Sequence, residues 1–543
     1  MSSAAAPTTS STTAPAVQAR ARAGVHRSVL VTPHWAATRA GEEVLAAGGS
    51  AVDAAIAAAA ALSVVYPHNT SLGGDLVALV RTADGRIRCV NATGPAGAAT
   101  DATALRGRHG GEMPVRGADT VTVPGAVRGW EALATVAGRL PWAQLLAPAI
   151  RWAREGVPVS RSLHRAIGHT LPDLKTGEGL AELLAPGGRP LRHGELLVQS
   201  ALAETLVQVA AGGPSAFYTG DLAARLVDGL RAAGSPLRTD DLAAFTPEVT
   251  DPLVRDVAGR TVVTSPPNTQ GFALLRTLAA AEAAGLTPER ALSAGVEVLA
   301  RELYACGLLR DGVLADLRTG GPSADDLMTM DAGEVPDVPV ARRALNTASG
   351  DTVGISAVDD DGTAVSLIQS VYGHFGSFVL DPATGVLFQN RGSSFSLEQG
   401  SPNLAAPGRR PSHTLMPVMT LRGDRVETVC SVMGGKAQPQ VHAQVLLQSF
   451  AGRTAAESVS APRWVVGPLD RTDPPEGARL EADADDAVAD ALDAAGFAVT
   501  TIPATDEDTG QVNLVLISPD GGFDAAADPR ADGTCVLVER RSS

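Results

Sequence analysis

The alternation of apolar and polar positions is clearest near residue 350, where a loop of small residues leads into a strand. Residues 346–351 are small and mostly polar, and from Thr352 to Val358 apolar side chains recur at alternate positions. The segment 359–362, Asp-Asp-Asp-Gly, then predicts a tight hairpin turn, and 363–370 predicts a second strand. Thr352 is therefore expected where a loop becomes a strand.

Elsewhere the pattern predicts a mixture of helices and strands. Predicted helices cover about 36–48, 51–65, 142–155, 196–211, 223–233, 291–309, 439–449 and 487–495. Predicted strands cover 76–80, 87–90, 120–128 (broken at Pro124-Gly125 before a helix near Trp130), 414–421, 426–432, 497–502 and 512–517. The apolar run 51–65 contains Asp53 and is short for a membrane span, so we expect a buried helix.

Composition and charge argue against several classes of protein, namely nucleic-acid-binding, membrane-binding, disulfide-rich and metal-binding proteins. The chain has 543 residues, 45% hydrophobic and 3% aromatic, so a large core must be built from aliphatic side chains. The net charge of −15 argues against nucleic acid and anionic membranes as partners. The four cysteines are too widely spaced for a disulfide framework or a metal site, and we expect buried free thiols and no metal. They are Cys89, Cys306, Cys430 and Cys535.

Residues 1–23 are rich in Ala, Ser, Thr and Pro, which is typical of a flexible tail. A secretory signal has basic residues followed by an apolar run, whereas here Arg20 and Arg22 follow a polar stretch. The expected location is the cytoplasm.

Cleavage of the Asp351–Thr352 peptide bond would give Thr352 a free α-amine. Its pKa, about 8, would let the amine accept the proton of the threonine's own hydroxyl. One residue would then supply both nucleophile and base. Gly-Asp-Thr alone is also an ordinary turn, so this hypothesis depends on the surrounding motifs. No phosphate-binding loop, paired-histidine motif or Gly-x-Ser-x-Gly elbow competes with it.

The surrounding motifs are the strand-turn-strand after Thr352, Phe375-Gly376, Asn390, Arg410-Pro411, Met416-Pro417, Gly434-Gly435 and Asp528-Pro529-Arg530. In order and approximate spacing they resemble the gamma-glutamyltransferase family of N-terminal nucleophile hydrolases. The resemblance covers about residues 24–538. The resemblance implies an α+β fold of four layers, αββα. It also implies autocleavage at Asp351 and Thr352 into fragments 24–351 (behind the tail) and 352–543, which stay associated as one intertwined domain.

The resemblance also implies catalytic roles. Ser370 matches the hydroxyl that binds the new amine, and Gly434 and Gly435 match the pair whose backbone N–H groups form the oxyanion hole. A hydroxyl in a strand and a tight turn would explain these residues without catalysis. No cofactor is implied.

The substrate-facing positions depart from the glutathione-acting members. Where those enzymes hold the substrate's α-carboxylate with an arginine, this chain has Asn91 to Gly94, which offers only neutral hydrogen bonds. Arg106, Arg108 or Arg116 are possible substitutes, although most loop arginines are solvated. The other departures are Tyr372 for an asparagine, Arg391 and Ser394 for a glutamine and an aspartate, and His413 and Thr414 for two serines. If Arg391 faces the pocket rather than solvent, the pocket should favour an anionic group over an α-ammonium.

We therefore expect a self-processing threonine hydrolase or acyltransferase that cleaves an amide bond of a small molecule, gamma-glutamyl-like or of a related acyl group, through an acyl-Thr352 intermediate. Glutaryl-type acylases, oxamate-type amidohydrolases and carbon–carbon bond hydrolases of secondary metabolism remain alternatives within the resemblance. An uncleaved, inactive binding protein is the alternative from another class.

Overall fold

Strands buried on both faces build the centre of the molecule. The computed structural model describes residues 16–21, 28–173, 178–335, 352–468 and 474–539. The Thr352 sheet has the order β21 (Thr534–Val538), β2 (Ser28–Thr32), β10 (Thr352–Val358), β11 (Ala364–Ser370), β3 (Asp75–Arg81), β4 (Ile87–Ala92) and β7 (Glu248–Thr250). The Gly434 sheet has the order β1 (Val17–Ala21), β20 (Phe523–Ala527), β19 (Gln511–Ile517), β15 (Arg425–Met433), β14 (Val418–Arg422), β9 (Arg260–Thr264) and β8 (Leu253–Val257).

The two sheets stack face to face. Apolar side chains such as Val77 and Val429 fill the layer between them. Gly354 of β10 lies so close to β15 that an added Cβ would come within 2.9 Å of Ser431, which explains the glycine in the middle of this buried strand. The Ser356 and Ser431 hydroxyls also hydrogen-bond across the layer at 3.0 Å. These contacts fix the alignment of β10 on β15.

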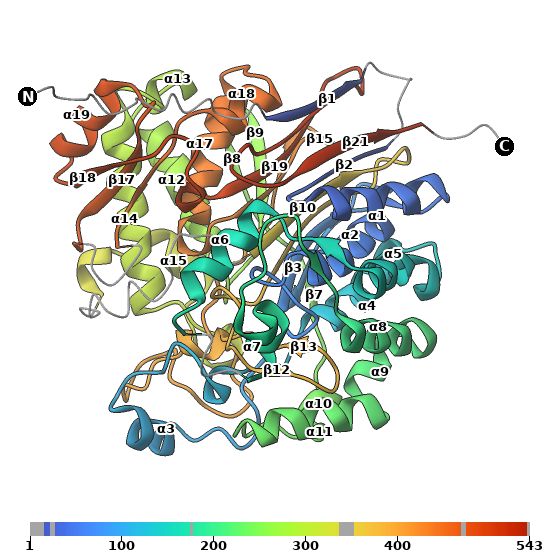
Figure 1. The fold of residues 1–543 in the computed structure, drawn as a ribbon. Helices are drawn as coiled ribbons and strands as arrows, with labels where there is room; N and C mark the ends of the chain where they lie inside the picture. The colour runs from blue at the N-terminus through green and yellow to red at the C-terminus, as the bar shows by residue number, and fades with distance from the viewer. Residues whose placement is uncertain (1–15, 22–27, 174–177, 336–351, 469–473, 540–543) are drawn as a thin grey trace, which may run out of the picture.

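Helices cover both outer faces, so the predicted αββα arrangement is confirmed. The Thr352 sheet carries α1 (Trp35–Ala46), α2 (Ala51–Val65) and α4 (Ala126–Ala137), with α5 (Trp142–Glu155) and α8 (Ser200–Gly212) outside them. The Gly434 sheet carries α12 (Gly271–Ala283), α17 (Gln438–Phe450) and α18 (Ala455–Ser460), with α14 (Val296–Gly312) outside α12. In Figure 1 these two layers lie on opposite sides of the sheets.

The remaining elements are peripheral. The other helices are α3 (Ala102–His109), α6 (Arg161–Thr170), α7 (Glu178–Leu184), α9 (Ser215–Tyr218), α10 (Gly220–Ala232), α11 (Thr239–Ala243), α13 (Pro288–Ala291), α15 (Ala324–Thr329) and α19 (Asp486–Ala494). The short or separate strands are β5 (Val157–Pro158), β6 (Leu196–Leu197), β12 (Leu380–Asp381), β13 (Val386–Leu387), β16 (Trp464–Val466), β17 (Gly477–Glu481) and β18 (Ala498–Ile502).

The helix α2 is buried along its whole length, as its sequence predicts. Its polar Asp53 belongs to a capping box, in which the Ser50 hydroxyl accepts from the Asp53 amide and the Asp53 carboxylate accepts from the Ser50 amide. The charge inside the apolar run therefore marks the start of the helix. No helix in the described part of the chain has both the length and the apolar character to cross a membrane.

The structure differs from several sequence predictions. The helix predicted from residue 196 begins at Ser200, after the short strand β6. The strand predicted over 120–128 is an extended segment outside any sheet, because the amides of Val123 and Gly125 donate to Pro95 and Gly74 rather than to a neighbouring strand. The helix after it begins at Ala126. Part of the predicted tail is also ordered, since β1 pairs with β20 along the edge of the Gly434 sheet.

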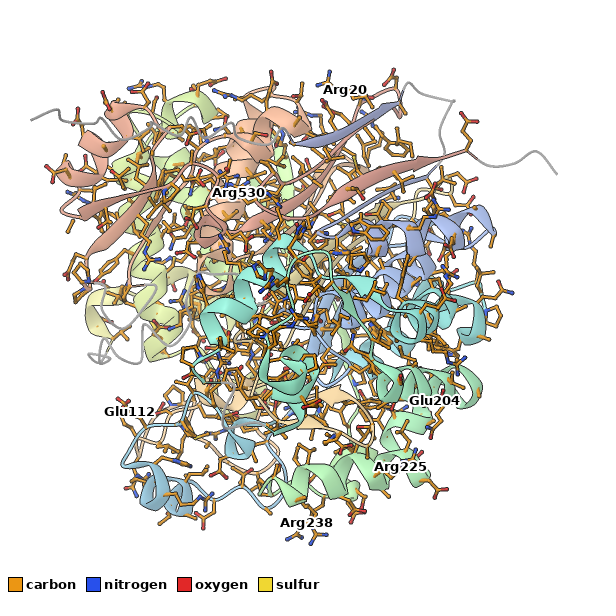
Figure 2. The ribbon with its side chains drawn as sticks, viewed as in Figure 1. Arg20, Glu112, Glu204, Arg225, Arg238 and Arg530 are labelled. Carbon is orange, nitrogen blue, oxygen red and sulfur yellow. The ribbon has the colours of Figure 1, made fainter. Side chains whose placement is uncertain are left out.

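Two arginines inside the protein, Arg463 and Arg530, are paired with acids. Arg530 lies in the interior in Figure 2, whereas the labelled Arg20, Glu112, Glu204, Arg225 and Arg238 lie on the surface. Arg530 binds Glu481 and Asp528, and Asp528 also binds Arg463 at 2.6 Å. Arg463 in turn donates to the Gly510 carbonyl at 2.9 Å. The Asp528-Pro529-Arg530 motif thus anchors a buried ion network beneath the Gly434 sheet.

The cysteines carry no disulfide. Cys89, Cys306 and Cys430 are buried free thiols, as predicted, and Cys535 is half-buried.

Candidate active site

Polar side chains gather at one end of the two stacked sheets. The register of β10, β11 and β3 places Thr352 opposite Ser370, and Ser370 opposite Asp75. From the other sheet, the segments next to β9 and β14 meet this end, because Asn91 binds Asn268 at 3.1 Å and Asp75 binds His413 at 3.1 Å. Side chains far apart in sequence therefore lie together.

Thr352 is the first residue of β10, and its side chain is buried. Its hydroxyl donates to the Ser370 hydroxyl at 3.1 Å, and the Ser370 oxygen also accepts from the Tyr372 amide at 2.8 Å. The Asn69 side chain donates to the Thr352 carbonyl at 3.3 Å. Thr352 is thus held by Ser370 of β11 and by Asn69, which precedes β3. The predicted cleavage partner Asp351 lies outside the described residues.

The Gly434-Gly435 turn directly follows β15. Because β15 packs on β10 at Gly354, two residues along from Thr352, this turn leaves the sheet at the same end. Gly435 has φ +50°, a left-handed conformation that favours glycine, and its carbonyl accepts from Gln270 at 2.9 Å. The Gln270 hydrogen bond therefore holds the turn in a defined shape.

Arg391 is buried, not solvated. Its guanidinium stacks over the Tyr372 ring at 3.5 Å from the ring centroid and donates to the Thr414 hydroxyl at 3.3 Å. Tyr372 has φ 78°, a strained value for a side-chain-bearing residue, and this turn follows directly on Ser370. The structure thus groups three predicted substrate-binding positions, Tyr372, Arg391 and Thr414.

His413 forms a buried pair with Asp75. Its Nδ1 accepts from the Leu415 amide at 3.2 Å, so Nε2 carries the proton and donates to Asp75. Burial, together with the charges of Arg391 and Arg410, lowers the pKa of His413 well below its usual value. The ring is therefore neutral near pH 7, and the pair consists of a neutral donor and a carboxyl acceptor.

Two other predicted substrate-binding residues, Asn91 and Ser394, form hydrogen bonds to other groups of the protein. The Asn91 amide donates to Asn268 and its oxygen accepts from Thr93. The half-buried Ser394 hydroxyl hydrogen-bonds the Arg391 and Ser412 carbonyls at 2.9 and 3.0 Å. Neither residue supplies a charge.

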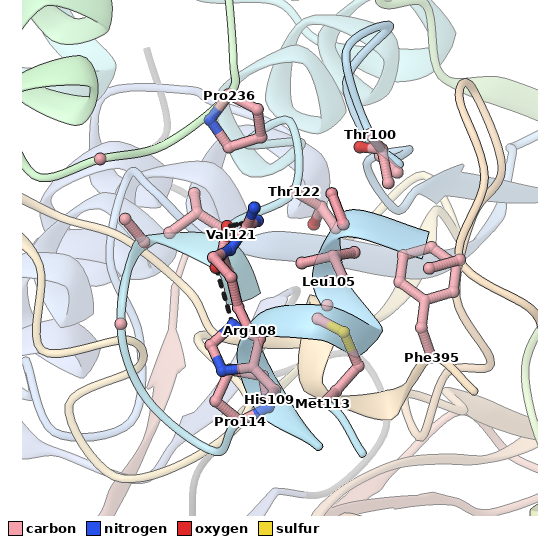
Figure 3. Close-up of a pocket in the computed structure, with 18 of the residues that line it drawn as sticks. Thr100, Leu105, Arg108, His109, Met113, Pro114, Val121, Thr122, Pro236 and Phe395 are labelled. Atoms are coloured by element: carbon pink, nitrogen blue, oxygen red, sulfur yellow. Dashed lines mark hydrogen bonds and ion pairs between the residues drawn. The ribbon is translucent and has the colours of Figure 1, made fainter. Parts of the chain in front are cut away.

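The candidate substitute arginines have hydrogen-bond partners of their own, although Arg116 lies against Gly373, next to Tyr372. Arg106 donates to the Leu397 carbonyl, and Arg116 donates to the Gly376 carbonyl while stacking over Phe378. Arg108 binds Asp119 through two hydrogen bonds of 3.0 and 2.9 Å in the wall of a cavity of about 570 Å³. Figure 3 shows residues that line this cavity, among them Arg108, His109 and Phe395. His109 also hydrogen-bonds the Asp119 carboxylate. These contacts favour Arg391 as the pocket's cation.

Comparison with known proteins identifies the family. The profile described as Gamma-glutamyltranspeptidase matches residues 37–538. The chain belongs to this family. Like its relatives it is an enzyme, a hydrolase or acylase with the N-terminal nucleophile hydrolase fold.

The relatives of this family member differ in the substrates that they are named for. It is 35% identical to the glutathione hydrolase-like YwrD proenzyme of Bacillus subtilis, over 94% of this chain and 98% of that protein. It is also 35% identical to the oxamate amidohydrolase proenzyme of Klebsiella pneumoniae, with the same coverage of 94% and 98%. The crystal structure of cephalosporin acylase from Bacillus halodurans superposes with a TM-score of 0.88 at 30% identity, covering 98% of this chain and 99% of that one.

Sequence reasoning missed three residues of this family member's site. Asn69 and Asp75 bind the predicted site residues Thr352 and His413, and Gln389 reaches the site through Asp75. Their local sequence assigned none of the three a role in the site. Asp75 had one usable signal, since an acid beginning an apolar strand needs a buried partner. That partner, His413, is remote in sequence.

The glycine turn provides a test of the predicted oxyanion hole. We expect Gly435→Val to reduce turnover at least about 100-fold, because a β-branched side chain disfavours φ +50° and would displace the backbone N–H donors. Gly423→Val is the matched control, since Gly423 has φ +59° with open space around it in the turn before β15. Steady-state rates of both purified variants decide the matter. Near-normal turnover of Gly435→Val would place the oxyanion elsewhere.

Proposed function

We propose that this enzyme is a self-processing N-terminal threonine amidohydrolase that forms an acyl ester on Thr352. The observation that carries the proposal is the buried Thr352 hydroxyl at the start of β10, 3.1 Å from the Ser370 hydroxyl. Autocleavage between Asp351 and Thr352 would create the α-amine that this hydroxyl needs as its base. The names of the relatives, several of which are proenzymes, support the same scheme.

In the proposed reaction, the Thr352 hydroxyl attacks the substrate's amide carbonyl and its proton passes to the α-amine. The carbonyl oxygen becomes negative and is stabilised by the backbone N–H groups of Gly434 and Gly435. The leaving amine takes the proton from the α-amine as the C–N bond breaks. Water, or an acceptor amine, then releases the acyl group from the ester by the reverse sequence of proton transfers. Ser370 would orient the α-amine and hydroxyl throughout.

We further propose that the acyl group carries a carboxylate and lacks an α-ammonium. Arg391 supplies a buried positive charge held against Tyr372 and Thr414. Ser394 stands where an ammonium would need an acid, and its hydroxyl is already bonded to two carbonyls. A buried charge without a partner is strongly unfavourable, so an α-ammonium should be excluded here. The relative named oxamate amidohydrolase is consistent with an anionic substrate.

The two proposed fragments would remain together after cleavage. The strands β10 and β11 of the second fragment lie between β2 and β3 of the first within one continuous sheet. Separating the fragments would break these ladders and expose the apolar layers on both sides.

Maturation can be tested on a denaturing gel. We expect purified wild type to run as two chains, the smaller beginning Thr-Val-Gly-Ile-Ser. Thr352→Ala removes the attacking hydroxyl and should leave one uncut chain, whereas Thr352→Ser keeps a hydroxyl and should still be processed. N-terminal sequencing identifies the cut. A wild-type protein that is fully active while intact would contradict the proposed mechanism.

The acyl preference can be tested with two anilides that differ only in the presence of the α-ammonium group. We expect a glutaryl anilide to be hydrolysed with kcat/KM at least about 100-fold above that of the γ-glutamyl anilide, because the glutamyl group brings a buried ammonium without an acid. Arg391→Gln should lower the absolute kcat/KM for the glutaryl compound by about 10- to 100-fold, since a buried charge partner is lost.

Arg106→Gln is the matched control for this experiment, because Arg106 binds the backbone carbonyl of Leu397 rather than Tyr372 or Thr414. Its preference should equal that of wild type. Efficient turnover of the γ-glutamyl compound by wild type would instead indicate a conventional glutamyl site whose clamp comes from another loop.

A further inference from the structure

The Gln270 side chain connects two segments of the proposed site. Its Nε2 donates to the Thr414 carbonyl at 2.8 Å and to the Gly435 carbonyl at 2.9 Å. The Thr414 hydroxyl accepts from Arg391, and Gly435 belongs to the turn to which we assign the oxyanion hole. Gln270 itself is fully buried and directly precedes α12. One carboxamide therefore links the segment that binds Arg391 to the glycine turn.

The orientation of this carboxamide follows from its partners. The two carbonyls can only accept hydrogen bonds, so the atom between them must be the nitrogen. On the other side, Arg310 donates to the Gln270 Oε1 at 3.4 Å and to the Lys436 carbonyl at 3.1 Å, and a guanidinium can only donate. Asp311 holds Arg310 through hydrogen bonds of 2.9 and 3.1 Å. Both N–H groups and the oxygen of the carboxamide thus have partners, which fixes its position.

The glycine turn depends on contacts of this kind for its direction. Glycine can adopt many backbone conformations, and an added Cβ on Gly434 would still lie 3.6 Å from the Gln438 amide nitrogen, so side-chain packing does not confine this residue. The Gly434 carbonyl accepts from the Ala437 amide at 2.8 Å, which is a contact within the turn itself. Gln270 ties the next peptide, that of Gly435, to a segment outside the turn.

We propose that Gln270 is a positioning residue that couples the Arg391 pocket to the oxyanion turn, so that binding of the acyl group's carboxylate aligns its carbonyl with the turn's backbone donors. This inference rests on the proposed function and deepens it. A substrate held at both points can use the binding energy of its carboxylate to lower the barrier at the reacting carbonyl. The alignment is sensitive, because a displacement of about 1 Å can cost on the order of 100-fold in rate. The carboxylate should therefore raise kcat as well as lower KM.

The test compares glutaryl and pentanoyl anilides, which share chain length and leaving group and differ in the terminal carboxylate. We expect the wild-type kcat for the glutaryl compound to exceed that for the pentanoyl compound at least about 10-fold. Gln270→Met keeps the side-chain length but removes both donors, and should reduce this kcat ratio to about 3 or less. The KM for the glutaryl compound should change less than about 3-fold, because Arg391 remains in the pocket. General damage to the fold would instead lower both kcat values by the same factor and leave the ratio unchanged.

Gln444→Met is the matched control. The Gln444 carboxamide is also buried and likewise donates to two backbone carbonyls, those of Gln440 and Trp464, at 3.2 and 2.8 Å. It joins α17 to β16, and none of its partners belongs to the proposed site. This variant loses the same kind of hydrogen bonds and should keep the wild-type kcat ratio.

Arg310→Lys tests the same link without altering Gln270. Lysine keeps a positive charge near Asp311 but lacks the planar fork that reaches the Gln270 oxygen. We expect the kcat ratio to fall in the same direction by a smaller factor, about 2- to 5-fold. The two segments should stay attached in both variants, because the Met416 amide donates to the Gln438 side chain at 3.1 Å and so provides a second link between them.

The outcomes separate this inference from the proposed function. A wild-type kcat ratio retained by Gln270→Met, or an equal fall of the ratio in Gln444→Met, would overturn the coupling while leaving the proposed threonine hydrolase in place. Equal kcat values for the two anilides in wild type would do the same. Failure of wild type to cleave either anilide would overturn both proposals for these acyl groups.

Discussion

The antiparallel register across β10, β11 and β3 is the constraint on which the site depends. It sets Thr352, Ser370 and Asp75 opposite one another at the end of three buried strands. Because successive side chains point to opposite faces, a shift of one residue would move every apolar side chain to the wrong layer. Both faces of these strands are buried, so the core enforces the register. The positions of the polar groups are therefore set by hydrophobic packing.

The Gly434 sheet contributes the glycine turn to the candidate site, because its strand β15 packs closely on β10. Gly354 allows β10 to pack on Ser431, and the chain then continues through Met433 to the Gly434 turn. The buried Arg463 ties Gly510 to the Asp528 carboxylate on the far side of this turn. Removing one partner of such a buried pair typically costs about 3 to 5 kcal/mol, so the network has one favoured arrangement. A rigid turn of this kind suits backbone donors that must hold a transition-state charge without rearranging.

Local pattern was sufficient for much of the fold and for the nucleophile hypothesis. The helix α5 and the strand β10 have the predicted bounds, because their apolar spacing agrees with their burial. The segment around Val123 was misassigned because β-branched alternation does not reveal where a strand's amides find acceptors. The strand β1 was missed for a related reason, since its partner β20 lies about 500 residues away.

The site residues also divide into those that local sequence could predict and those that depend on long-range contacts. A hairpin that is evident in the local sequence brings Ser370 to Thr352. The hydrogen-bond partners of Asp75, by contrast, are His413 and Gln389, which lie more than 300 residues further along the chain. The sequence shows that Arg391 carries a positive charge. It does not show that Arg391 is buried against Tyr372, whose backbone has a positive φ. Long-range contacts of this kind are determined by the folded topology and leave little trace in local composition.

The central claim is that Thr352 carries the acyl group. Its most direct test is mass spectrometry of the smaller fragment after rapid acid quenching of wild type with excess glutaryl anilide, followed by mapping of the modified peptide. The account predicts one added glutaryl group on the fragment, located on the hydroxyl of Thr352 and absent from a sample quenched without substrate. A glutaryl group found on another side chain, or turnover with no acylated fragment at any quench time, would contradict it.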